Sequence, residues 1–170
     1  MTIRRLSLAV FFVLCTICVV QVVWYYPQLP EKVASHFGLS GRPDAWSTKT
    51  FFATFYLATT GGCALLFLGI SFWMSKIPIS LINLPNKAYW LSPERKKKTF
   101  DFMFHYFLWF ASATLLLLLD MFQQSILVHL GKTESLPHPL LSLGLYISFT
   151  IVWSIGLIVK FGKKGKSQQS

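Results

Sequence analysis

The sequence is poor in charged residues, and in acidic residues above all. Only 13% of its 170 residues are charged, about half the share found in an average soluble domain, and only six residues are acidic. So few charges cannot cover a water-facing surface, whereas 54% of the residues are hydrophobic and 16% are aromatic. The composition argues against a soluble globular protein, rules out disorder and is typical of an integral membrane protein.

Cysteines and catalytic signatures are also scarce. All three cysteines lie inside apolar runs, so the sequence supports neither a secreted disulfide framework nor a zinc knuckle. It contains no GxSxG, HExxH, P-loop or dinucleotide fingerprint, which makes catalysis the weaker expectation, and we expect no cofactor. Binding or sensing is the expected class of function. A small-solute or ion transporter subunit and a metal-dependent membrane enzyme stay open as alternatives.

Four apolar runs are long enough to cross a bilayer as helices. They cover residues 6–26, 51–74, 102–128 and 140–159. The sequence therefore predicts an all-α integral membrane protein, a single domain over residues 1–170 built as a bundle of four transmembrane helices. Residues 27–50 would form a structured outer loop, residues 75–100 a cytoplasmic loop and residues 160–170 a basic cytoplasmic tail.

Lysine and arginine are distributed unevenly around these spans, with twelve on one side and four on the other. Such residues are retained on the cytoplasmic side, so the count predicts a cell-membrane protein with both termini cytoplasmic. We expect the lipid bilayer as its partner, with anionic lipids at the basic cytoplasmic face. The net charge of +10 flanks apolar runs, so no nucleic-acid partner is expected.

Local signals predict the conformation of both loops. Residues 31–37 are expected to form a short helical turn, and Gly41–Asp44 a β-turn. In the cytoplasmic loop, Ser92 is predicted to cap a helix that begins at Pro93 and continues into the third span.

Two segments carry a resemblance to a known family. In LPEKVASHFGLSGRPDAWSTK, a Leu-Pro pair precedes His-Phe, Gly-x-Pro-Asp and an aromatic residue. The pattern residues are Leu29, Pro30, His36, Phe37, Gly41, Pro43, Asp44 and Trp46. This pattern resembles a bacterial and archaeal membrane domain of unknown function, number 1648, which also forms the N-terminal part of Sdp-type immunity and signalling proteins. The resemblance implies a helical membrane protein and an immunity or signalling role.

The cytoplasmic segment NLPNKAYWLSPER is similar to one found in short members of the same family. Its motif residues are Asn83, Pro85, Asn86, Tyr89, Trp90, Pro93, Glu94 and Arg95.

The third span carries a polar stripe. At 100° per residue, one helical face collects Asp101, His105, Ser112, Asp120 and Gln123. A carboxylate such as Asp120 in hydrocarbon costs at least ~2.5 kcal/mol unless it faces the bundle or a wet cavity, so the stripe is predicted to point inward. One interpretation is a ligand or ion site formed by Asp120, Gln123 and Gln21. The other is an ion pair between Asp120 and Arg42 or Lys49 that fixes the outer loop.

We predict a ligand site under the outer loop that combines His36 and Asp44 with Asp120. Gln123 and Arg42 would lie beside it. Such an anionic pocket with one imidazole suits a cation or the amine end of a peptide. The expected partner is a peptide, another membrane protein or a second copy of the chain. A zinc site is a weaker hypothesis, without a supporting ligand spacing. Its candidate ligands are His36, Asp44, Asp120 and His129.

Overall fold

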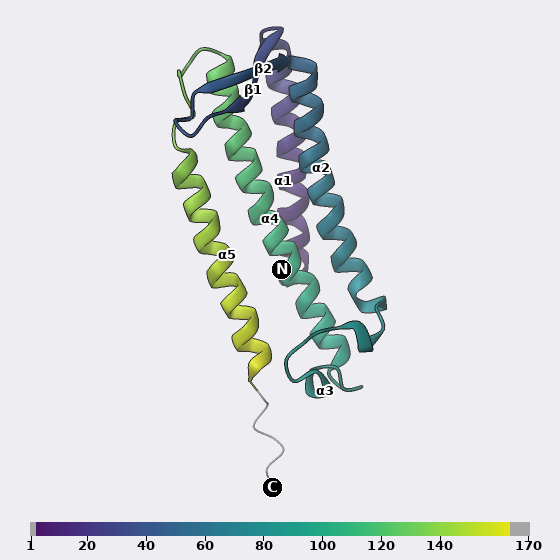
Figure 1. Cartoon of the computed structure of the whole chain (residues 1–170). Coiled ribbons are helices and arrows are strands. Elements are labelled where there is room, and N and C mark those ends of the chain that lie inside the picture. The colour runs from purple at the N-terminus through teal and green to yellow at the C-terminus, as the bar shows by residue number, and fades with distance from the viewer. Residues whose placement is uncertain (1–2, 164–170) are drawn as a thin grey trace.

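The computed structural model describes residues 3–163 and contains four long helices. They are α1 (Ile3–Tyr25), α2 (Lys49–Trp73), α4 (Lys96–His129) and α5 (Pro139–Gly162) (Figure 1). All four are long and apolar enough to cross a membrane, which confirms that the four predicted runs are helical. Most of the expected basic tail, residues 164–170, lies outside the described residues.

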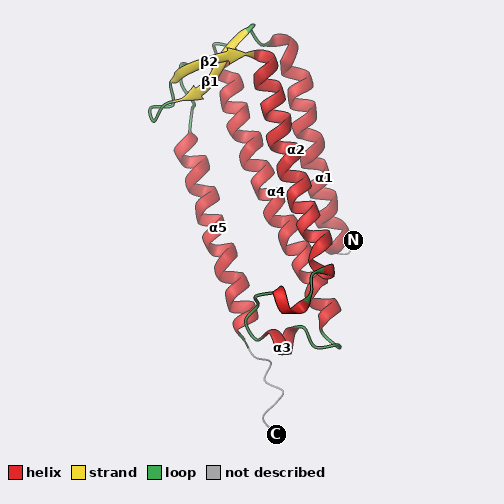
Figure 2. Ribbon diagram, turned by 45° about the vertical axis from the view of Figure 1, so that its right-hand side comes forward, coloured by secondary structure: helices red, strands yellow, loops and turns green. Residues whose placement is uncertain are grey.

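Shorter elements connect the long helices. They are η1 (Tyr26–Gln28), β1 (Lys32–Phe37), β2 (Pro43–Thr48), η2 (Met74–Lys76), η3 (Ile79–Leu81) and α3 (Lys87–Trp90). The two strands and residues 130–138 lie at one end of the bundle, which we call the hairpin end (Figures 1 and 2). Residues 74–95 lie at the other end, which we call the loop end.

Helix α4 occupies the centre of the bundle. Helices α1 and α2 pack along one side of it, and α5 runs along the other side, separated from α1 and α2 (Figure 2). The first side contains the dense core, in which Phe11, Tyr56 and Leu108 are fully buried. In contrast, no residue in the most apolar stretch of α5 is buried.

The hairpin corrects two expectations. Strands β1 and β2 pair antiparallel, with Lys32 opposite Thr48 and an irregular register around His36, so the expected helical turn over residues 31–37 is wrong and the chain is not all-α. A single helical turn leaves most of its backbone groups unpaired, whereas a strand pair satisfies those that face the partner strand. Val33 and Ala34 also become buried against the helices.

The reverse turn lies three residues earlier than expected. Gly41 donates to the Gly38 carbonyl at 2.9 Å, and the Gly38 amide bonds the Arg42 carbonyl at 2.9 Å. Gly41 has a φ of 74°, which a residue without a Cβ adopts readily. Pro43 then begins β2, at a strand position where its missing N–H is tolerated. The expected Gly41–Asp44 turn is therefore wrong.

Capping signals explain two of the helix ends. The Thr48 hydroxyl accepts a hydrogen bond from the Phe51 amide at 3.1 Å and caps α2. Helix α4 ends in a Schellman motif, because Gly131 has a φ of 67° and Lys132 donates to the Leu127 carbonyl at 2.9 Å.

The start of α4 differs from the prediction by three residues. Helix α4 begins at Lys96, and Ser92 to Arg95 form a separate turn in which the Ser92 carbonyl accepts from the Arg95 amide at 3.0 Å. The Ser92 hydroxyl bonds Glu94 at 3.0 Å rather than capping a helix. The predicted start at Pro93 is therefore wrong.

Candidate functional site at the hairpin end

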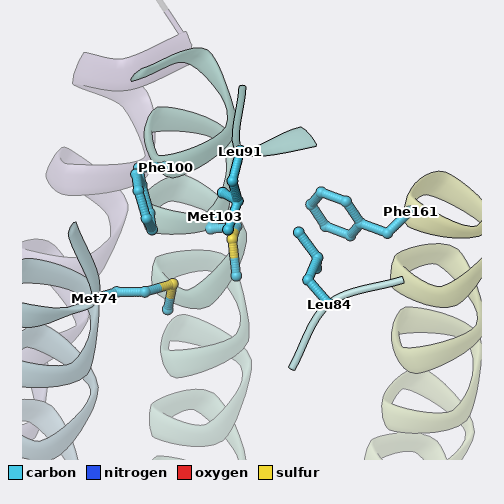
Figure 3. Close-up of a cluster of buried hydrophobic side chains, with 6 residues drawn as sticks. All are labelled: Met74, Leu84, Leu91, Phe100, Met103 and Phe161. Atoms are coloured by element: carbon cyan, nitrogen blue, oxygen red, sulfur yellow. The ribbon is translucent and has the colours of Figure 1, made fainter. Parts of the chain in front are cut away.

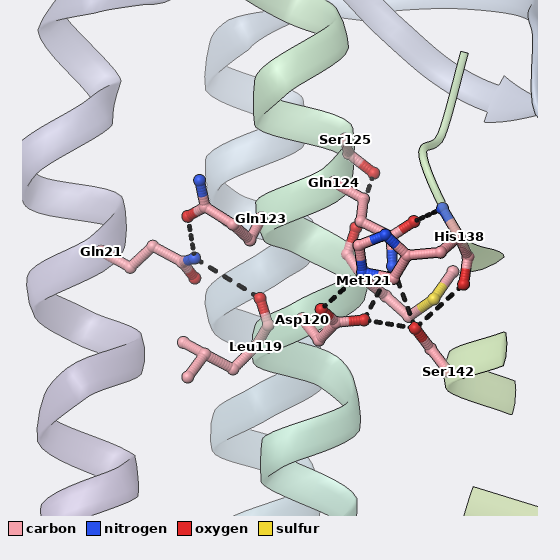
Figure 4. Close-up of polar contacts among 9 residues, drawn as sticks. All are labelled: Gln21, Leu119, Asp120, Met121, Gln123, Gln124, Ser125, His138 and Ser142. Carbon is pink, nitrogen blue, oxygen red and sulfur yellow. Dashed lines mark hydrogen bonds and ion pairs between the residues drawn. The ribbon is translucent and has the colours of Figure 1, made fainter. Parts of the chain in front are cut away.

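Asp120 lies in the apolar part of α4 and faces the first turn of α5 (Figure 4). Its Oδ2 accepts hydrogen bonds from the Ser142 hydroxyl at 2.6 Å and from the Gln124 amide at 2.7 Å. The Gln124 amide also donates to the Ser142 hydroxyl at 3.1 Å. These contacts satisfy Oδ2 and fix the plane of the carboxylate.

Gln124 organises this cluster from a fully buried position, with 1% of its surface exposed. Its carbonyl oxygen accepts from the backbone amide of His138 at 3.0 Å, so one side chain joins α4, the connecting loop and α5. Gln124 and Ser142 were missing from the predicted site. A glutamine one helical turn after an aspartate in an apolar run was the signal available in the sequence.

The second oxygen of Asp120 is less constrained. Oδ1 lies 3.6 Å from His138 Nε2, and the side chain of Asp120 is 39% exposed. Both residues line a groove of about 530 Å³ between α4 and α5, which we call the α4–α5 groove. The rest of its lining is almost entirely apolar: Ala113, Leu116, Leu117, Leu141, Leu145, Tyr146 and Phe149, together with Ser142.

A second polar cluster lies on the opposite side of α4 (Figure 4). The Gln21 amide donates to Gln123 Oε1 at 2.8 Å, and the buried Tyr56 hydroxyl donates to Gln21 Oε1. Gln21, Asp120 and Gln123 together line a depression of about 500 Å³ between α1 and α4. The structure therefore brings these three residues to one surface, as the first interpretation of the polar stripe expects. The amides of Gln21 and Gln123 are bonded to each other rather than to Asp120.

His36 and Asp44 form a pair of their own on the hairpin. His36 Nδ1 lies 2.5 Å from Asp44 Oδ1, and the two side chains are 68% and 50% exposed. Within residues 3–163, no hydrogen bond or ion pair joins either of them to Asp120. The three residues predicted to form one pocket thus occupy two places.

The basic residues expected to pair with Asp120 have other partners. Arg42 lies 3.6 Å from Glu134, and Lys49 lies 2.8 Å from Glu31. The ion pair predicted between Asp120 and Arg42 or Lys49 is therefore wrong. Arg42 is near Glu134 because the hairpin turn contacts residues 130–138. Lys49 is near Glu31 because α2 starts directly after β2, and the Lys49 amide donates to the Glu31 carbonyl.

His129 fixes the hairpin to the end of α4. It is 9% exposed, its Nε2 lies 3.1 Å from the Ala34 carbonyl, and its ring packs edge-on against Phe52 at 4.6 Å. Across the described part of the chain, no three His, Cys, Asp or Glu side chains are grouped closely enough to hold a metal ion. Of the candidate zinc ligands His36, Asp44, Asp120 and His129, only His36 and Asp44 lie together, as the hairpin pair, and two side chains do not make such a group.

Several motif residues of the hairpin have structural roles. Leu29 is buried, Phe37 stacks on His129 with ring centroids 6.2 Å apart, and the Gly41 carbonyl accepts from the Leu136 amide at 2.9 Å. The positive φ of Gly41, 74°, favours glycine at this point of contact between the two segments. Trp46 is exposed and lies near Lys32.

These motif residues lie within a segment that matches a family of known proteins. Residues 13–60 match a domain of unknown function, DUF1648. The match covers most of α1, the hairpin and the first part of α2, and it confirms the resemblance to this domain. No curated protein and no solved structure matches the chain.

The loop end lies outside the DUF1648 match, and its motif binds the last turn of α5. The Asn86 amide donates to the carbonyls of Phe161 and Gly162, each at 3.0 Å, and Trp90 Nε1 donates to the Phe161 carbonyl at 3.1 Å. Asn86 adopts a left-handed conformation with a φ of 51°, which asparagine tolerates better than most residues. We call these three hydrogen bonds the α5 clamp.

A small hydrophobic cluster supports the α5 clamp (Figure 3). It consists of Met74, Leu84, Leu91, Phe100, Met103 and Phe161. The guanidinium of Arg95 lies 4.1 Å from the ring centre of Tyr89, and the Thr99 hydroxyl bonds the Trp90 carbonyl at 2.8 Å. The second motif therefore has a structural explanation that the sequence did not suggest. It supplies hydrogen-bond donors to backbone carbonyls at the C-terminus of α5, which have no partner within the helix.

Proposed function

We propose that the protein is a binding or sensing module of the cell membrane that captures a cationic ligand at its hairpin end. In this proposal the four long helices cross the bilayer, the hairpin end is extracytoplasmic and both termini are cytoplasmic. The excess of Lys and Arg outside the hairpin end supports this orientation. The same basic residues would contact anionic lipids on the cytoplasmic side.

The carboxylate of Asp120 is the observation that carries the proposal. An ionised carboxylate among apolar helices is costly and needs a compensating partner. Gln124 and Ser142 satisfy Oδ2, but within residues 3–163 the only partner of Oδ1 is His138 Nε2 at 3.6 Å, beyond hydrogen-bond distance. A protonated amine would complete Oδ1 with a charge-assisted hydrogen bond, which is stronger than one between neutral groups.

The surroundings of Asp120 connect this site to the hairpin. His138 belongs to the loop that contains Leu136, and the Leu136 amide bonds the Gly41 carbonyl in the hairpin turn. A ligand that moves His138 would therefore act on the hairpin through a short chain of contacts. A sensing role and an immunity role both begin with such a capture step, so the proposal covers both.

Ligand-observed NMR tests the capture of a cation. The probe is butylammonium chloride, with butanol as its neutral analogue, added to the protein in phosphatidylcholine nanodiscs. We expect saturation transfer to butylammonium that disappears in Asp120→Asn and persists in Asp44→Asn, which changes a carboxylate of the separate hairpin pair. Equal signals in Asp120→Asn and the unchanged protein would exclude Asp120 as the cation site.

Cysteine labelling tests the orientation. In a variant without the three native cysteines, Ser40→Cys in the hairpin turn should react with an impermeant maleimide on intact cells. Ser80→Cys at the exposed loop end should react only after the membrane is opened. The reverse pattern would invert the proposed topology.

A further inference from the structure

The chemical character of the α4–α5 groove points to a narrower class of ligand. We infer that the ligand is an amphiphile with one protonated amine, whose apolar chain lies in the α4–α5 groove and whose amine meets Asp120. This inference rests on the proposed function, since it assumes that Asp120 captures a cation.

The groove is polar at one end and apolar along the rest. Asp120, His138 and Ser142 mark its end near the hairpin. Ala113, Leu117 and Phe149 lie one to two helical turns further toward the loop end. The hydroxyl of Tyr146, which also lines the groove, is 2.7 Å from the Thr114 hydroxyl and is thereby engaged within the protein. This distribution matches a molecule with a single polar head and an apolar chain.

Asp120 borders both depressions, but its Oδ1 lies near a residue of the groove. Oδ1 lies next to His138, which lines the α4–α5 groove and not the depression beside α1. In the α1 depression, Gln21 and Gln123 bond each other. Oδ1 accepts no hydrogen bond from the described residues, and its ion-pair partner, His138, belongs to the α4–α5 groove.

The groove is open to the lipid phase from the side. Leu141 and Leu145 on its α5 wall are 61% and 64% exposed, and Leu116 on its α4 wall is 55% exposed. An amphiphile dissolved in the adjacent leaflet can enter without passing through water. A phospholipid would fit less well, because its phosphate would lie close to the carboxylate and like charges repel. Charge complementarity thus favours an amphiphile with a single protonated amine over a phospholipid.

Photolabelling tests the inference. The probe is dodecylamine with a diazirine in its chain, compared with the matching dodecanol, and the protein is held in phosphatidylcholine nanodiscs. Mass spectrometry of peptides should place the label on the groove walls, within residues 113–120 and 141–149. Labelling there should fall about tenfold in Asp120→Asn, because a charge-assisted hydrogen bond is lost.

Two further variants test the groove itself. Ala113→Phe and Leu145→Phe both fill the groove, and the second is a lipid-exposed position where folding should be unaffected. Leu65→Phe, on the exposed face of α2, is the control, because it makes the same substitution as Leu145→Phe at an exposed position outside the groove. We expect Ala113→Phe and Leu145→Phe to reduce labelling of the groove walls and Leu65→Phe to leave it unchanged.

The outcomes separate the inference from the proposed function. If butylammonium still requires Asp120 but the dodecylamine label spreads over all exposed helix faces, the amphiphile inference is wrong and cation capture stands. Equal labelling of the groove walls by dodecylamine and dodecanol would contradict the inference that the site recognises the amine. If neither amine depends on Asp120, both the inference and the proposed function fail.

Discussion

Helix α4 is packed differently on its two sides. Toward α1 and α2 it buries large side chains completely, among them Phe11, Tyr56 and Leu108. Toward α5 it uses stacked aromatic rings, such as Tyr106 on Trp153 at 4.0 Å, and polar contacts such as that of Asp120 with Ser142. Apolar burial drives association weakly within a lipid phase, so close packing and hydrogen bonds decide which helices adhere. The first side is therefore densely packed, and the second leaves room for a groove.

The largest difference in stability should be between leucine-to-alanine substitutions on the α1–α2 side of the bundle and on α5. Leu108→Ala opens a cavity in the three-helix core and should lower the free energy of unfolding by about 2 kcal/mol or more. Leu145→Ala on α5 removes an exposed side chain and should have little effect. Denaturant titration in detergent micelles measures both variants. Equal losses would mean that α5 belongs to the same packed core.

The α5 clamp should have the next largest effect. Asn86→Gly removes two hydrogen bonds to α5 but keeps the left-handed backbone accessible, so we expect a loss of about 1 kcal/mol. Hydrogen exchange should increase in the last turn of α5 and not in α1. Asn83→Gly, at an exposed position of the same segment, is the control. An unchanged exchange rate at the end of α5 would show that Trp90 and the hydrophobic cluster hold the last turn of α5 without Asn86.

The polar contacts of Asp120 should couple locally. A double-mutant cycle of Asp120→Asn with Ser142→Ala should give a coupling energy of at least about 0.5 kcal/mol, because the two side chains share a hydrogen bond. The cycle of Asp120→Asn with Arg42→Gln should be additive, since Arg42 pairs with Glu134. Thermal melting of the variants provides the data. Coupling to Arg42 would place that residue near Asp120 after all.

The smallest effect is expected on the hairpin surface. Arg42 and Glu134 are 71% and 90% exposed, and exposed ion pairs contribute little to stability. Arg42→Gln and Glu134→Gln should leave the melting temperature within experimental error, at low and at high salt. A salt-dependent loss would indicate that this pair helps to hold the hairpin on residues 130–138.

Some of the structure was predictable because it depends on short stretches of sequence. The four helices follow from long apolar runs, and the match over residues 13–60 agrees with the motif around His36. The strand β1 was missed because its partner, β2, lies beyond a turn, and local signals do not report pairing. The start of α4 was misplaced because Ser92 has a competing partner in Glu94.

The sequence alone determined that a carboxylate would lie among apolar helices and that it would need a partner. Only the tertiary structure decided which residue that partner is. The packing of α4 against α5 places Asp120 beside Ser142 and His138. The hairpin turn places Arg42 next to Glu134 instead. The same holds for Asn86, whose hydrogen bonds reach carbonyls 75 and 76 residues away. Helix formation is a local property of the chain, whereas the pairing of polar groups depends on how the helices are packed.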